Sequence, residues 1–110
     1  MPSASKPRRY PRIDLPRGFP VAWRSGGQQE VSRVGTVGMG GLFIYTPEPP
    51  PVGTLLVLLF DLPGGEVRAR AVVRDCRAGE GMGVEFTAMS FEARARLSHI
   101  LRRLLRDVDC

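Results

Sequence analysis

Residues 66–74 read Glu66-Val67-Arg68-Ala69-Arg70-Ala71-Val72-Val73-Arg74. From Val67 to Val73 the odd-numbered positions are apolar, whereas positions 68, 70 and 74 are arginine and Val72 is the exception. A period of two with one apolar and one charged face is typical of a half-buried antiparallel strand. The sequence therefore predicts a strand over residues 66–76, in a sheet with one face turned to water.

Five other segments have strand character, and glycine- or proline-rich turns separate them. They cover residues 19–23, 30–37, 42–45, 54–60 and 81–86. The segment 54–60 is nearly all apolar, which predicts a core strand covered on both faces.

The period of the pattern changes after residue 89. Ser90 is a good helix N-cap, Glu92 follows in the first turn, and apolar residues then recur at helical spacing. Six short strands and a terminal amphipathic helix predict an all-β fold, a six-stranded antiparallel β-barrel with the C-terminal helix packed across it. Closure of the barrel is favoured because it removes exposed strand edges.

The size and charge of the chain limit the classes of function. Its 110 residues indicate one domain, and 16 Lys+Arg against 11 Asp+Glu give a formal charge of +5, which favours anionic partners. We expect a disordered tail over residues 1–7, a domain over 8–106 and a short tail over 107–110.

Cys76 and Cys110 have no metal-ligand spacing around them, and the first residues lack an apolar leader. The longest apolar run is too short for a membrane span, so we expect a cytoplasmic protein without metal or cofactor.

Residues 8–12 form a basic segment of unusual composition. Arg8, Arg9 and Arg12 lie among prolines that disfavour a helix, so the segment is expected to be an extended arm. The planar fork of an arginine suits phosphate oxygens and the O6 and N7 atoms of guanine. A glycine-rich turn at 38–41 follows about one hairpin later. We therefore expect the arm and the turn to lie side by side and to bind an anionic or guanine-like ligand.

With these features the chain resembles the PilZ domain family over about residues 8–105. Members of that family are six-stranded barrels with a C-terminal helix, and many bind the second messenger cyclic di-GMP through two motifs. One motif, RxxxR, lies in the N-terminal arm, and the other, [D/N]xSxxG, lies at the turn between the second and third barrel strands. The run Gly81-Met82-Gly83-Val84-Glu85-Phe86 before the helix is also similar to the family.

Arg8 and Arg12 match the first motif, but the second motif departs from the family pattern. Thr36 stands where Asp or Asn belongs, Gly38 stands where Ser belongs, and Gly41 is kept. A threonine hydroxyl lacks the charge and the two acceptor oxygens that a carboxylate offers to guanine, and each lost charge-assisted hydrogen bond costs about 1.5–3 kcal/mol. The resemblance implies a cyclic di-GMP site made by Arg8, Arg9, Arg12, Thr36, Gly38, Gly40 and Gly41.

A second stretch also spells an acid-x-Ser-x-x-Gly pattern. It runs from Glu30 through Ser32 to Gly35. It begins with Glu, and using it would place the turn inside a run of β-branched residues. We interpret this match as coincidence.

Catalysis and nucleic acid binding find little support. His99, the only histidine, is expected on the solvated face of the helix, no catalytic set can be assembled, and the glycine turn does not lead into a phosphate-binding helix. Most aromatic residues are predicted to face inward, so a base-stacking platform is not expected.

We therefore predict a non-enzymatic receptor or adaptor that relays the cyclic di-GMP level to a protein partner, with motility, pili, polysaccharide or virulence as outputs implied by the resemblance. The arginines of the helix are expected to be solvated or, failing that, to contact an acidic protein. The alternative is a divergent adaptor that does not bind the nucleotide and acts only through protein–protein contacts.

Overall fold

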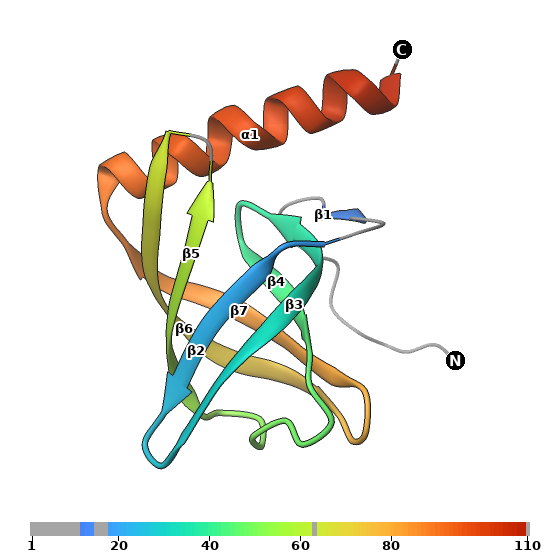
Figure 1. The fold of residues 1–110 in the computed structure, drawn as a ribbon, viewed down its shortest axis with the longest axis vertical. Coiled ribbons are helices and arrows are strands. Elements are labelled where there is room, and N and C mark those ends of the chain that lie inside the picture. Colours follow the sequence, from blue (N-terminus) through green and yellow to red (C-terminus); the bar gives the residue numbers. More distant parts are fainter. Residues whose placement is uncertain (1–11, 15–17, 63, 110) are drawn as a thin grey trace.

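The computed structural model of the chain describes residues 12–14, 18–62 and 64–109, in which seven strands precede one helix (Figure 1). The elements are β1 (Arg12–Asp14), β2 (Pro20–Ser25), β3 (Gln28–Gly38), β4 (Gly41–Tyr45), β5 (Leu55–Leu62), β6 (Gly65–Arg77), β7 (Gly81–Met89) and α1 (Phe91–Asp109).

Strands β2 to β7 form a closed antiparallel barrel. The order β3-β2-β5-β6-β7-β4 is completed by a β3–β4 pairing, and β1 adds to the edge of β3. The predicted six-stranded barrel with a C-terminal helix is confirmed. Strand β1 was not predicted, because three residues near several prolines carry no readable period. Helix α1 continues to Asp109, past the predicted domain end at residue 106.

The core lies inside the barrel and under the helix. Val21, Trp23, Leu42, Ile44, Leu58, Met82 and Val84 are almost fully buried, and Ala93, Leu97 and Leu101 join them from α1. Figure 1 shows α1 lying across one end of the barrel. Burial of these apolar side chains at roughly 25 cal/mol per Å² is the main stabilising contribution of the fold.

A helix N-cap and two side-chain hydrogen bonds fix the position of α1. Ser90 Oγ accepts a hydrogen bond from the Ala93 amide at 3.0 Å, which confirms the predicted N-cap. The Arg96 guanidinium donates to the carbonyl oxygens of Gly64 and Glu66 at 3.1 and 2.9 Å. These bonds attach the helix to the β5–β6 hairpin.

Strand β5 is buried on one face only. Leu56, Leu58 and Phe60 point into the core, whereas Leu55 is 72% exposed and Val57 and Leu59 are half-buried on the outside. The prediction that this strand is covered on both faces is wrong. A continuous apolar run does not distinguish a strand buried on both faces from one that leaves an apolar face outside.

Candidate functional site

Strand β1 brings the end of the basic arm to the glycine turn. Arg12 is paired with Gly38, Ile13 with Val37, and Asp14 with Thr36. This pairing is available because β2 begins at Pro20, opposite Arg33, and leaves the rest of that edge of β3 open. The backbones of Arg12 and Gly38 are therefore adjacent in the sheet. Arg8 and Arg9, the other predicted arm residues, lie outside the described residues.

The β3–β4 hairpin turns at residues 39–40, which confirms the predicted position of the turn. Gly41 does not have the positive φ that would demand glycine in a turn. Position 41 requires glycine because of packing, since a Cβ there would overlap the carbonyl oxygen of Val84 in β7. Gly41 thus holds β4 close to β7, a structural task that does not depend on a ligand. Gly40 accepts a backbone hydrogen bond from Phe86 at 2.8 Å.

A β-bulge precedes the turn. Val34 is paired with Ile44 and Thr36 with Phe43, so Gly35 is an additional residue on β3. Bulges redirect the side chains that follow them and are frequent beside functional sites. The Tyr45 ring lies over Gly35, where a Cβ would come within 2.6 Å of the ring atoms.

Among the predicted site residues, Thr36 is the one whose polar side chain the structure describes. Among the described residues, its Oγ1 atom is buried without a hydrogen-bond partner. A buried hydroxyl in this state costs about 1–3 kcal/mol. A polar group on a bound molecule would remove that cost.

Asp14 is a candidate site residue that the sequence interpretation missed. Its carboxylate is exposed, and its position opposite Thr36 places the two Cβ atoms about 4.5–5.5 Å apart. The arrangement supplies, from β1, a carboxylate next to the position where the family motif carries one on β3. A single residue separates Asp14 from Arg12 in the sequence, but only the β1–β3 register connects Asp14 to Thr36.

An aromatic pair lies on the outer surface beside Thr36. The Phe43 and Tyr45 rings meet edge to face with centroids 5.4 Å apart, and the Arg77 guanidinium lies 5.3 Å from the Phe43 centroid. Phe43 and Tyr45 point outward because Leu42 and Ile44 point into the core. The general prediction of inward-facing aromatics did not single out this pair.

The competing motif in the first half of β3 belongs to a polar network. Thr46 Oγ1, in a residue that is 2% exposed, donates to Glu30 at 3.0 Å, and Trp23 Nε1 donates to Ser32 Oγ at 2.9 Å. Gln28 Nε2 donates to the other Glu30 oxygen at 3.3 Å. Glu30 and Ser32 are therefore occupied by internal hydrogen bonds.

The described part of the chain contains no group of three or more His, Cys, Asp or Glu side chains that could hold a metal ion. His99 is exposed on α1, as predicted. In the same residues, no helix has both the length and the apolar character needed to cross a bilayer.

Comparison with known proteins gives one family match. The PilZ domain model matches residues 6–103. No curated protein matches the sequence.

Three solved structures share the fold at low sequence identity. The Bacillus subtilis inhibitor of motility MotI/DgrA has a TM-score of 0.73 at 20% identity, with 96% of this chain and 57% of that chain covered. The complex of MrkH from K. pneumonia with c-di-GMP has a TM-score of 0.76 at 20% identity, covering 96% and 55%. The PlzA protein of Borreliella burgdorferi, also in complex with c-di-GMP, has a TM-score of 0.68 at 12% identity, covering 84% and 40%. The present chain thus spans between two fifths and three fifths of the length of these proteins.

Proposed function

The chain belongs to the PilZ domain family, and we propose that it is a non-enzymatic cytoplasmic receptor that binds cyclic di-GMP at the β1–β3 edge. The observation that carries the proposal is the pairing of Arg12 with Gly38, which places the last residue of the first motif opposite a residue of the second. Two of the similar structures, MrkH and PlzA, are complexes with c-di-GMP.

In this proposal the arm arginines bind the guanine and phosphate groups of the ligand. Arg8, Arg9 and Arg12 offer bidentate donors to phosphate oxygens and to guanine O6 and N7. Thr36 and the 38–41 turn form the opposite wall. The ligand carries two phosphates, and the net charge of +5 favours its approach.

Asp14 takes over the role of the acidic residue that Thr36 replaces. Guanine presents N1–H and N2–H side by side, and a carboxylate accepts from both. Asp14, opposite Thr36, offers such a carboxylate at the same edge of β3. We expect Asp14→Asn, which keeps the shape but removes the charge, to weaken cyclic di-GMP binding about tenfold, or about 1.4 kcal/mol. Asp61→Asn, which makes the same change at an exposed carboxylate on β5, is the matched control.

Isothermal titration of the full chain with cyclic di-GMP tests the proposal. Wild type should give a saturable heat, Arg12→Ala should weaken binding at least tenfold, and Arg102→Ala on the exposed face of α1 should bind like wild type. Absence of heat, together with no shift in thermal unfolding at high ligand concentration, would reject it.

A second candidate function is an adaptor that acts through protein contacts alone. The observation in its favour is Gly38, which has no side chain to replace the family serine. A wild-type chain that fails the titration but still binds a protein partner would identify this alternative. In either case the signal is passed to a partner protein.

A further inference from the structure

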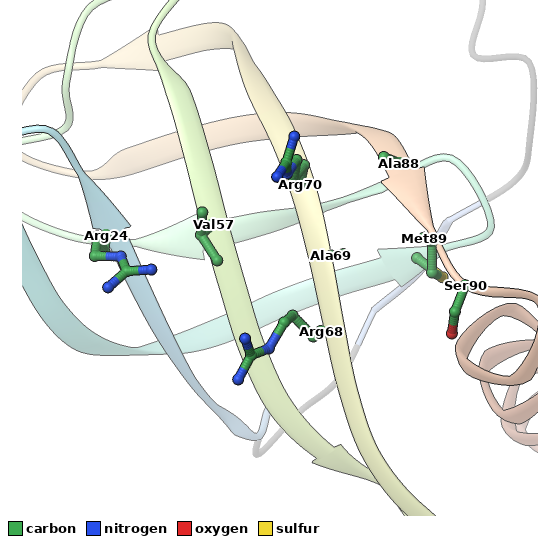
Figure 2. A pocket seen from close by; sticks show the side chains of 8 residues that line it. All are labelled: Arg24, Val57, Arg68, Ala69, Arg70, Ala88, Met89 and Ser90. Atoms are coloured by element: carbon green, nitrogen blue, oxygen red, sulfur yellow. The ribbon is translucent and has the colours of Figure 1, made fainter.

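The outer surface of β2, β5 and β6 combines an apolar centre with exposed arginines. The outward side chains of β5 are Leu55, Val57 and Leu59. Arg24 of β2 and Arg70 of β6 are both paired with Val57 in register, and Arg68 is paired with Leu59. We call this set of six residues the β5 face. Figure 2 shows Arg24 on one side of Val57 and Arg68 and Arg70 on the other.

The arginines of the β5 face have no ion-pair partner within residues 12–14, 18–62 and 64–109. The ion pairs found among the described residues are Arg74–Glu85, Arg77–Asp75 and Arg77–Glu80, all elsewhere. Arg24, Arg68 and Arg70 make no ion pair with any carboxylate in that part of the chain. Neighbouring strands are about 4.8 Å apart and a strand rises about 3.3 Å per residue, so the three arginines start from backbone positions within about 12 Å of one another. Three unpaired positive charges in so small an area favour an occupant with several carboxylates.

The space between these side chains is an open hollow. It has a volume of about 400 Å³ and is lined by Arg24, Val57, Arg68, Arg70 and, at one end, Met89 and Ser90. Ser90 caps α1, so the positive end of the helix dipole also lies at this end of the hollow. The apolar floor indicates that the occupant also carries large apolar side chains, because a small anion would leave that floor exposed to water.

A partner on the β5 face must contact the outward side chains of the strands and cannot pair with the backbone of β5. Between Val57 and Leu59, β5 is paired with β2 on one side and with β6 on the other, so no strand can be added there. An apolar centre with arginines around it is the composition of a protein–protein interface. On α1 the exposed arginines Arg102 and Arg103 flank no comparable apolar floor among the described side chains.

We propose that the β5 face is a docking surface for an acidic segment of a partner protein that carries large apolar residues between its carboxylates. In the barrel order, β5 and β6 lie opposite β4 and β3. A partner on the β5 face therefore leaves the β1–β3 edge free. This proposal does not depend on nucleotide binding.

The test begins with a phage-displayed library of random 12-residue peptides selected on the full chain. We expect enriched peptides to combine Asp or Glu with Leu, Ile, Phe or Trp. The strongest is synthesised, labelled and measured by fluorescence anisotropy, and its site is mapped by amide chemical shifts. Shifts should concentrate at residues 22–24, 55–59 and 68–70. Enrichment of peptides without acidic residues, or no enrichment, would overturn the proposal.

Charge reversal tests whether the peptide binds at the β5 face or is attracted only by the overall positive charge of the protein. The triple variant Arg24→Glu/Arg68→Glu/Arg70→Glu should weaken the peptide at least tenfold. The control, Arg94→Glu/Arg102→Glu/Arg103→Glu on α1, makes the same change in net charge and should weaken it less than threefold. Because a triple variant can fail to fold, Leu55→Ser is a second probe, and it should weaken the peptide at least threefold since Leu55 is 72% exposed and supports no core contact.

Three further outcomes would contradict the proposal. They are equal losses in the two triple variants, chemical shifts on α1, and tighter binding of a 12-nucleotide single-stranded DNA than of the peptide at the same residues. Arg12→Ala, which should weaken nucleotide binding at least tenfold, should bind the peptide like wild type. Failure of the docking proposal is thereby distinguished from failure of the proposed receptor function.

Discussion

In the first half of β3, Glu30 and Ser32 hydrogen-bond to Thr46 and Trp23, whereas in the second half the buried Thr36 hydroxyl has no partner in the part of the chain that the structure describes. Both halves spell a similar motif, with glycine five residues after the first position. The first half uses its polar groups to hold the barrel together. The second half leaves a polar group unsatisfied beside Arg12 and Asp14. The comparison teaches that the state of the hydrogen bonds, rather than the spacing of the residues, separates a structural motif from a candidate binding site.

The largest expected effect concerns the glycine that ends the second motif. Gly41→Ala should lower the free energy of unfolding by about 3 kcal/mol, because the new methyl group overlaps the backbone of Val84 in β7. Urea denaturation measures the change. Gly27→Ala, where a Cβ meets nothing within 4 Å, is the control and should stay within about 1 kcal/mol of wild type. Equal stability of the two variants would remove the packing explanation for Gly41.

An intermediate effect is expected in the first half of β3. Glu30→Ala should lower the free energy of unfolding by about 2 kcal/mol, since it leaves the buried Thr46 hydroxyl without its acceptor. The affinity for cyclic di-GMP should not change. The exposed Glu48, whose side chain is outside this network, provides the control Glu48→Ala. If Glu30→Ala abolished nucleotide binding at unchanged stability, the two halves would have been assigned the wrong way round.

The smallest effect on stability is expected at Thr36. Thr36→Val keeps the shape but removes a hydroxyl that has no partner among the described residues, so stability should rise by about 1 kcal/mol, the lower end of the cost of an unsatisfied hydroxyl. Thr46→Val is the matched substitution in the first half and should be destabilising by about 1–2 kcal/mol, because its hydroxyl has a partner. Thermal unfolding compares the two variants directly. A loss at Thr36 as large as that at Thr46 would mean that Thr36 has a structural partner.

The barrel could be predicted because local pattern and tertiary environment agree in most strands. In β6, the apolar positions Val67 and Val73 are buried and Arg68 and Arg70 are exposed, as the period of two requires. The prediction from the pattern was wrong at β5, because an all-apolar run does not indicate which face of the strand is exposed. It failed again at β1, whose three residues are strand only because the edge of β3 is open to them.

The candidate site was predictable in part. The turn at 38–41 follows from its glycines, and the strand that precedes it follows from its β-branched residues. Asp14 could not be found from the sequence, because its place opposite Thr36 depends on the register of β1. The bulge at Gly35 and the outward Phe43–Tyr45 pair also depend on the pairing of β3 with β4.

Chemical-shift mapping of the full chain with cyclic di-GMP tests the central claim most directly. Amide resonances of residues 12–14 and 36–41 should shift on titration, while those of 22–24 and 28–33 should stay unchanged. Shifts confined to the first half of β3, or no shifts at saturating ligand concentration, would contradict the account.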